Sequence, residues 1–432
     1  LPMIKRARAA TEPALEYITK IAHEAAHDKT RNLVLLSGVP GSGKTLVGLQ
    51  LVHSGWVDDL AVEREGSKPA APAVYLSGNG PLVEVLQHAL KDGGGEGRTF
   101  VQAIKKYVDF YSRRGAAMPP EHLIVFDEAQ RAHDAERVAK VHKKPVAMSE
   151  PQHLIEFCGR IPDWCVLVAL IGDGQAIHTG EEAGISLWAE AISATDDAQQ
   201  WQVHGSPSFS QMFESAGMSG KWNDVLNLDT EIRFHLTPKV HEFVAGILGG
   251  MKSSSMALLG DVLYQEGHRF LVSRDLNVAQ SYLKDRYEGA TEARYGILAS
   301  SKDKWLLSHG VDNSYMTTKR LKVGPWYNYP SSSPESCCQL QTVATEFSSQ
   351  GLELDCALLA WGSDLLWENG DWTVKYGGTN RPPLKDPQTV RKNVYRVLLT
   401  RGRDGTVIYI PKDERMNATY ERLVSVGMRE LV

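Results

Sequence analysis

The segment Gly38-Val39-Pro40-Gly41-Ser42-Gly43-Lys44-Thr45 decides the fold that this sequence predicts. It fits the pattern GxxxxGK[ST], and it stands between an apolar run, 33–36 (LVLL), and a helical pattern, 44–53. Backbone N–H groups in such a loop turn toward phosphate oxygens, and the positive end of the following helix adds to the attraction. A Gly-rich turn arising by chance is the alternative, which the strand–helix context disfavours.

The residues that we expect to bind ATP in this loop are Gly38, Gly41, Ser42, Gly43, Lys44 and Thr45. Lys44 would supply positive charge to the β and γ phosphates, and the Thr45 hydroxyl would coordinate Mg²⁺.

Short β-rich runs alternate with helical patterns along most of the chain. The runs are 33–36, 74–76, 123–126 and 166–171, and then 296–300, 356–361 and 406–410. Helical stretches such as 44–53 and 81–90 separate them, which predicts an α/β fold with parallel sheets and chemistry at the strand carboxyl ends. Between the two sets lies 202–224, rich in Ser, Gly and His. We therefore predict two domains, 1–225 and 226–432.

Two adjacent acids follow the run at 123–126, in the sequence LIVFDEAQ. Asp127 is expected to hold Mg²⁺, and Glu128 to act as general base toward the water that attacks the γ-phosphate. Alternation along an extended strand end would place the two carboxylates on different sides. Gln130 has two open interpretations: it reports the nucleotide state, or it is a plain surface glutamine.

The run at 166–171 leads into Gly172-Asp173-Gly174-Gln175. Gln175 is predicted to contact the γ-phosphate and the attacking water, and an ordinary Gly/Asp turn is the alternative. In the second half, Arg233 and Arg401 are candidates for arginine fingers on the developing charge, although an isolated arginine is usually part of a surface salt bridge.

The second half also contains the segment 345–353 (TEFSSQGLE), placed before the run at 356–361. Gly351 would allow close backbone approach, and Glu353 could accept a hydrogen bond from a ribose hydroxyl. Thr345 and Ser348 are candidates to donate to nucleic-acid phosphates. A Ser-rich loop before a buried strand is the plainer interpretation.

Taken in order, these segments resemble the superfamily 1 helicases. The segments 74–90, 172–184, 345–355 and 393–411 are more narrowly similar to the bacterial Schlafen-group DNA/RNA helicase domain family. The resemblance covers about residues 30–412. It implies a P-loop NTPase with two tandem RecA-like domains, nucleotide in the cleft between them, and single-stranded nucleic acid across their tops. It also implies phosphate contacts for Lys44, Thr45, Gln175, Arg233 and Arg401, and a ribose contact for Glu353.

Composition sets the remaining bounds. The chain has 432 residues, and 47 basic against 52 acidic side chains give a net charge of −5, which excludes a histone-like protein but leaves room for a local basic groove. Five cysteines without zinc spacing favour an intracellular protein, and the resemblance implies a bacterial one in the cytoplasm. The absence of an apolar run of about 18 residues predicts no membrane partner. The start at Leu1 suggests a piece of a longer protein.

Three functions remain open on the sequence. The first is an ATP-dependent helicase or translocase on single-stranded DNA or RNA. The second is a nucleotide-gated sensor that binds nucleic acid without unwinding it. The third is an accessory ATPase for an effector, such as a nuclease, elsewhere in a longer protein.

Overall fold

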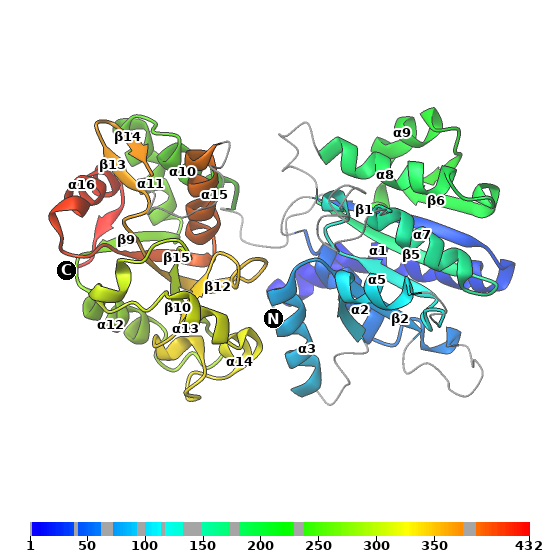
Figure 1. Ribbon diagram of the computed structural model, residues 1–432, viewed down its shortest axis with the longest axis horizontal. Coiled ribbons are helices and arrows are strands. Elements are labelled where there is room, and N and C mark those ends of the chain that lie inside the picture. The colour runs from blue at the N-terminus through cyan, green and yellow to red at the C-terminus, as the bar shows by residue number, and fades with distance from the viewer. Residues whose placement is uncertain are drawn as a thin grey trace. The chain divides into compact units, whose positions relative to one another are not determined.

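The computed structural model describes residues 2–38, 42–61, 72–92, 100–113, 117–132, 148–172, 181–228, 237–374 and 386–432 (Figure 1). Its contacts divide the chain into two units, Leu1–Val83 with Leu90–Arg233, and Glu84–Ala89 with Phe234–Val432. Each unit is built on its own parallel sheet with helices packed on both faces. The predicted α/β class with parallel sheets is thereby confirmed.

The first sheet has the strand order β3-β2-β4-β5-β1-β6-β7, and β8 pairs with the end of β1. Its strands are β1 (Arg31–Gly38), β2 (Ala73–Ser77), β3 (Val101–Ala103), β4 (Leu123–Phe126), β5 (Cys165–Gly172), β6 (Trp201–Gly205), β7 (Gly220–Trp222) and β8 (Asn227–Leu228). All pairings are parallel, so the carboxyl ends of β1, β5 and β4 lie side by side at one edge. The sheet thus gathers the segments that follow these three strands, although they are far apart in the sequence.

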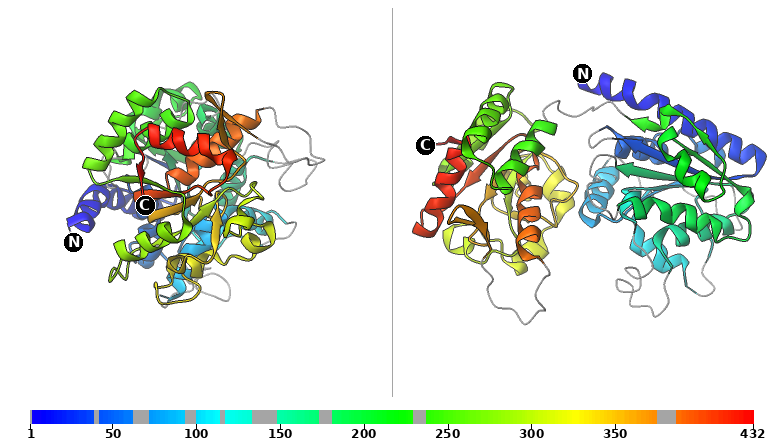
Figure 2. Two further views of the ribbon diagram at one scale, coloured as in Figure 1. Left: turned by 90° about the vertical axis from the view of Figure 1, so that its left-hand side faces the viewer. Right: turned by 90° about the horizontal axis from the view of Figure 1, so that it is seen from above.

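Helices cover both faces of this sheet. They are α1 (Pro2–Asp28), α2 (Lys44–His53), α5 (Ile104–Tyr111), α7 (Glu150–Arg160), α8 (Glu181–Ser193) and α9 (Ser210–Ser215). Helix α3 (Gly80–Asp92) is crossed by the division between the units. In α1, Leu15, Ile18 and Ala22 are buried at helical spacing, and the helix packs along α2 and the central strands (Figure 2). On the opposite face, α5, α7 and α8 cover a continuous apolar core.

The second sheet has the order β11-β10-β12-β15-β9-β16, again with parallel pairings. Its strands are β9 (Arg269–Ser273), β10 (Tyr295–Ala299), β11 (Val343–Thr345), β12 (Leu354–Ala360), β15 (Gly402–Tyr409) and β16 (Arg429–Glu430), and a separate hairpin is formed by β13 (Leu366–Glu368) and β14 (Asp371–Thr373). The helices of this unit are α10 (Thr237–Leu248), α11 (Ser253–Gln265), α12 (Leu276–Arg286), α13 (Tyr315–Arg320), α14 (Val323–Asn328), α15 (Pro387–Leu399) and α16 (Asn417–Ser425).

Every apolar run that was expected to be a strand is one. The segment 202–224, expected only to separate the two strand sets, instead lies mostly in β6, α9 and β7 of the first unit. The pairing of β8 with β1 carries the first sheet past residue 225. Among the described residues, no helix has the length and apolar character needed to cross a membrane.

Candidate nucleotide site and nucleic-acid surface

The phosphate loop begins where β1 ends, at Gly38, and leads into α2 at Lys44. Gly43 caps this helix with a φ of +98°, a left-handed conformation that glycine adopts without steric cost. A Cβ atom on Gly38 would lie 2.6 Å from both Leu228 O and Ser42 Oγ, so this position also requires glycine. Gly41 lies outside the described residues. A side chain at Gly38 would therefore clash with its neighbours, and Gly43 has a backbone conformation that favours glycine.

Lys44 and Ser42 face the interior of the loop. The Lys44 ammonium donates to Gly38 O at 2.5 Å, and the Ser42 hydroxyl is buried without a hydrogen-bond partner. An unpaired buried hydroxyl costs free energy unless a ligand satisfies it. A loop with an orphaned hydroxyl, a lysine and the amino end of α2 has the chemistry that binds phosphate.

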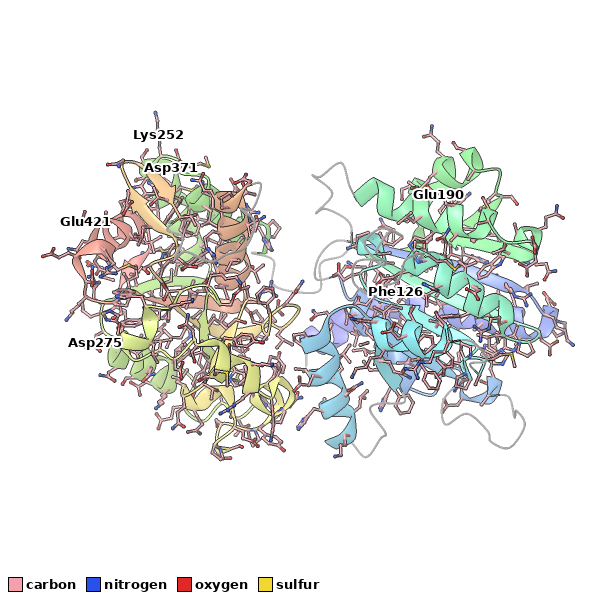
Figure 3. The ribbon with its side chains drawn as sticks, viewed as in Figure 1. Phe126, Glu190, Lys252, Asp275, Asp371 and Glu421 are labelled. Carbon is pink, nitrogen blue, oxygen red and sulfur yellow. The ribbon has the colours of Figure 1, made fainter. Side chains whose placement is uncertain are left out.

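Asp127 and Glu128 follow β4, whose last residue, Phe126, lies inside the first unit (Figure 3). We expected strand alternation to place the two carboxylates on different sides. This is wrong, because β4 ends at Phe126 and both residues lie in the turn that follows. Asp127 is buried and anchored by its N–H, which donates to Leu76 O at 2.9 Å, whereas Glu128 is exposed. Glu128 has a φ of +54°, an unfavourable conformation for a residue with a side chain. The strained turn gives one carboxylate a buried position and the other a solvent-facing one.

The environment of Asp127 suits a cation. Burial raises the pKa of the Asp127 carboxyl to about 6, the charge of Glu128 acts in the same direction, and the Lys44 ammonium opposes it. A buried carboxylate beside a second acid is stabilised by a bound cation, which removes the repulsion. Asp127 and the hydroxyl of Thr45 provide the oxygen ligands that Mg²⁺ prefers. These residues therefore fit the magnesium and nucleotide that the sequence predicts.

Gln130 links the acidic turn to the neighbouring strand. Its Nε2 donates to Glu128 Oε2 at 2.6 Å, and its Oε1 accepts from Gly172 N at 2.9 Å, at the end of β5. The side chain is only 6% exposed. The interpretation of Gln130 as a plain surface glutamine is therefore wrong. The backbone of Gln130 is also packed closely by Gly184 of α8, where a Cβ would lie 2.1 Å from Gln130 O.

Two predicted residues cannot be placed. Gln175 and Arg233 both lie outside the described residues. The strand before Gln175, β5, ends at Gly172 between β1 and β4, so the segment that carries Gln175 starts between the phosphate loop and the acidic turn. The phosphate contacts of Gln175 and Arg233 stay predictions.

Arg401 joins two motifs of the second unit. Its guanidinium donates from Nε to Val397 O at 3.0 Å, near the end of α15, and from Nη1 to Leu352 O at 3.1 Å. Gly351, just before Leu352, has a φ of +75°, so its turn rather than a close ligand approach explains the glycine. Glu353 follows, and its carbonyl accepts from the Tyr327 hydroxyl at 2.7 Å. The bond to Leu352 O thus brings Arg401, from the end of α15, next to the segment that carries Glu353.

A pocket of about 500 Å³ lies beside Glu353 in the second unit. It is lined by Tyr287, Ala290, Glu292, Ala293, Arg294, Tyr327, Glu353, Leu354, Asp355, Arg403 and Asp404. Arg403 forms ion pairs with Asp355 and Asp404 in its wall. Arg403 is therefore engaged within the pocket, whereas Arg401 is held by backbone carbonyls.

Thr345 and Ser348 bond to each other at the end of β11. Ser348 Oγ accepts from Thr345 N at 2.7 Å, and the two hydroxyl oxygens are 3.4 Å apart. Thr345 is buried and Ser348 half-buried. Both side chains shape the turn that presents Phe347, and their contact with a nucleic-acid phosphate stays a prediction.

The family model described as Schlafen group 3, DNA/RNA helicase domain, matches residues 31–412. The chain belongs to this helicase-domain family.

Three solved structures are similar to the chain at low identity. A DEAD box protein from the hyperthermophile Methanococcus jannaschii is 10% identical, with 94% of this chain and 88% of that chain covered and a TM-score of 0.26. The Pyrococcus furiosus Hef helicase domain is 10% identical, with 94% and 97% covered and a TM-score of 0.28. A variant of S. cerevisiae dbp5, bound to gle1 and ip6, is 12% identical, with 100% and 92% covered and a TM-score of 0.29. A search of the curated proteins finds no match.

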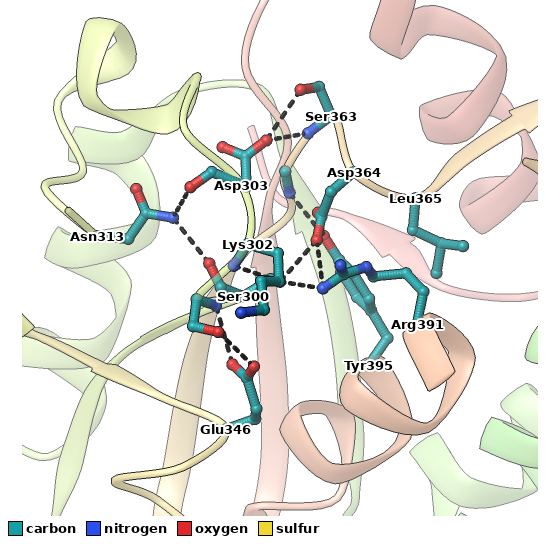
Figure 4. A network of polar contacts seen from close by, with 12 residues as sticks. Ser300, Lys302, Asp303, Asn313, Glu346, Ser363, Asp364, Leu365, Arg391 and Tyr395 are labelled. Carbon is teal, nitrogen blue, oxygen red and sulfur yellow. Dashed lines mark hydrogen bonds and ion pairs between the residues drawn. The ribbon is translucent and has the colours of Figure 1, made fainter. Parts of the chain in front are cut away.

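A buried polar network fixes the carboxyl edge of the second sheet in this helicase-domain chain (Figure 4). Asp364 accepts from Ser300 Oγ at 2.6 Å and from the Tyr395 hydroxyl at 2.7 Å, and it pairs with Arg391 at 3.0 Å. Burial raises the pKa of Asp364, and the Arg391 charge opposes the shift. Ser300 follows β10 and Asp364 follows β12, whereas Arg391 and Tyr395 both belong to α15, so the network ties these two loops to α15.

A second link at this edge joins the loops that follow β10 and β11. Glu346 accepts from Ser301 N at 2.9 Å and from Ser301 Oγ at 2.6 Å, so the two loops are tied together. The next residue in each loop is exposed: Phe347, at 62%, and Lys302. Exposed aromatic and cationic side chains on adjoining loops are typical of surfaces that bind single-stranded nucleic acid.

Other aromatic side chains of the second unit differ from Phe347 in their surroundings. Trp326, Trp361 and Trp372 are core residues with at most 1% exposure, so they serve packing. Trp305 carries the guanidinium of Arg415 over its ring at 4.9 Å. No pattern in the sequence revealed the exposure of Phe347.

Proposed function

We propose that this helicase domain hydrolyses ATP with Mg²⁺ and couples the hydrolysis to movement along single-stranded DNA or RNA. The observation that carries the proposal is the meeting of a phosphate loop, a buried Asp127 and a solvent-facing Glu128 at one sheet edge. These are the parts that phosphoryl transfer to water needs: phosphate binding, charge neutralisation and a base near the attacking water.

Each residue has a separate task in this reaction. Lys44 binds the β and γ phosphates, and Thr45 and Asp127 hold Mg²⁺, which neutralises charge on the phosphate oxygens. Glu128 accepts the proton of the attacking water. Gln130 orients Glu128, because its amide bonds the carboxylate at one end and the backbone at the other. Gln175, Arg233 and Arg401 stabilise the charge that develops on the γ-phosphate, and Glu353 receives the ribose.

The nucleic acid is proposed to lie on the carboxyl edge of the second sheet. Phe347 stacks on a base, Lys302 contacts the backbone, and the turn of Thr345 and Ser348 supplies donors to phosphate. None of these contacts reads base identity, which agrees with a strand-tracking function rather than sequence recognition. Lys304 and the cationic end of α13, Lys319 and Arg320, add exposed positive charge to the same unit.

Glu128→Gln tests the chemistry of the proposal. The substitution keeps the shape and removes the base, so the variant should bind ATP with wild-type affinity and lose at least about 100-fold in turnover. Phosphate release and binding of a fluorescent ATP analogue are measured on the same preparation. Full turnover by this variant would remove Glu128 from the role of base. Nucleotide-dependent nucleic-acid binding without strand movement would favour a sensor.

A further inference from the structure

Tyr75 is a buried tyrosine on β2 whose ring lies against helix α2. The residue has no exposed surface. A Cβ atom on Gly48 would lie 2.9 Å from Tyr75 Cε2, so α2 carries a glycine where the ring passes. Gly48 is three residues after Thr45, and positions three apart share one face of a helix. The ring is therefore locked beneath the face of α2 that carries the Thr45 hydroxyl.

The hydroxyl of Tyr75 has no hydrogen-bond partner although it is fully buried. It lies close enough to Asp127 and Thr45 for both side chains to shift its pKa. A phenol hydroxyl carries its proton at neutral pH and can act as a hydrogen-bond donor.

A structural role alone does not account for this hydroxyl. Phenylalanine would fill the same space beside Gly48 without burying an orphaned polar atom. The two side chains next to the hydroxyl are the ones to which the proposed function assigns Mg²⁺. Asp127, buried next to the charged Glu128, gains from any donor that reaches it.

We propose that Tyr75 is a positioning residue of the magnesium–nucleotide site, and that its hydroxyl donates a hydrogen bond to the Asp127 carboxylate when the cation is bound. This inference rests on the proposed binding of Mg²⁺ and nucleotide by the phosphate loop. It adds a side chain from β2, a strand that also accepts the Asp127 N–H at Leu76 O. Tyr75 touches neither phosphate nor water in this role, because it acts through Asp127.

The test is the Mg²⁺ dependence of nucleotide binding in Tyr75→Phe, which keeps the ring packing. Binding of a fluorescent, non-hydrolysable ATP analogue to the full chain is titrated with Mg²⁺ and repeated in EDTA. We expect the Mg²⁺ concentration for half-maximal binding to rise at least fivefold, with unchanged affinity in EDTA. The thermal midpoint should be unchanged or raised, since an orphaned hydroxyl is removed.

Tyr107→Phe is the matched control. Tyr107 is also buried in the first unit, but its hydroxyl donates to Glu121 Oε2 at 3.0 Å. This variant should lower the thermal midpoint and leave the Mg²⁺ titration unchanged. A Tyr75→Phe titration that matches the wild type would overturn the role of Tyr75 alone. Binding by the wild type without any dependence on Mg²⁺ would overturn the proposed magnesium site and this inference together.

Discussion

Gln130 and Glu128 are joined by a hydrogen bond of 2.6 Å from the amide Nε2 to the carboxylate Oε2. The other end of the amide accepts from Gly172 N, so the carboxylate is anchored through Gln130 to the end of β5. Since Glu128 is exposed and its backbone is strained, this bond is what fixes the direction of the side chain. The position of the proposed base therefore depends on a residue two places along the chain.

Gln130→Ala is expected to lower kcat for ATP at least tenfold with little change in KM. The base loses its orientation, whereas the phosphate loop is untouched. The variant should also lose about 1–3 kcal/mol of stability, because Gly172 N is left unpaired. Steady-state kinetics and thermal unfolding measure the two effects. Gln202→Ala, which removes only an exposed contact to Lys221, is the control. A wild-type kcat in Gln130→Ala would contradict the orienting role.

Arg401 and Arg403 should differ sharply in their effect on turnover. Arg401→Ala is expected to lower kcat at least about 1,000-fold, the lower end of the range found for arginine fingers. Arg401→Lys should recover little, since an ammonium cannot hold both Val397 O and Leu352 O in a fork. Arg403→Ala should stay within a fewfold of the wild type, because Arg403 pairs with Asp355 and Asp404. The reverse order of effects in a phosphate-release assay would show that the wrong arginine was assigned.

Phe347→Ala is expected to weaken binding of single-stranded nucleic acid by roughly 5- to 150-fold, the loss of about 1–3 kcal/mol for one stacked base. The effect should not depend on salt. Lys302→Ala should instead lower the slope of log K against log salt by about 1. Fluorescence anisotropy at several salt concentrations separates the two. Phe110→Ala, at an exposed phenylalanine of α5, is the control. Equal losses in Phe110→Ala and Phe347→Ala would argue against a stacking site.

His204 makes stability fall in acid. Burial, and then the charge of Lys221, lowers its pKa to about 4. An unfolded histidine takes up its proton near pH 6.5, so the unfolded state binds more protons between about pH 6.5 and 4. Stability is therefore complete above about pH 6.5 and falls toward pH 4, by up to about 3 kcal/mol for this group.

His204→Gln should reduce that loss. The glutamine amide can still donate to Asn32 Oδ1, which lies 2.9 Å from His204 Nε2, but it does not titrate. Thermal midpoints at pH 7.5 and pH 5 are compared in the wild type and the variant. His268, whose pKa burial also lowers to about 4, supplies a second acid-sensitive group, so part of the dependence should stay. An unchanged difference between the two pH values would rule out His204 as a contributor.

The sequence predicted the sheets more fully than the side-chain contacts of the site. Strands such as β4 and β5 are recognisable in the sequence as apolar runs, because helices cover both faces of their sheet. In contrast, β6 contains Gln202, His204 and Gly205, and its burial beside β1 depends on a bond from His204 to Asn32 that no local pattern encodes. The burial of Gln130 could not be predicted from the sequence either, since it depends on the packing of α8 over this residue.

The chemistry of the phosphate loop could be predicted from the sequence, because phosphate binding requires glycines and a lysine at fixed spacing. The role proposed for Tyr75 could not be predicted from the sequence, because tyrosine is common in strands. Its signal is the paired glycine, Gly48, inside a helix where glycine is otherwise unfavourable. The turn at Asp127 and Glu128 likewise follows from three-dimensional packing and not from strand alternation.

The most direct measurement is phosphate release from ATP with and without single-stranded DNA and RNA, for the wild type and Lys44→Ala. Coupled hydrolysis predicts that one of the polymers raises the wild-type rate at least tenfold and that the variant, having lost its contact with the phosphates, shows no stimulated rate. Hydrolysis that neither polymer changes, or stimulation that survives in Lys44→Ala, would contradict a nucleic-acid-coupled ATPase centred on this loop.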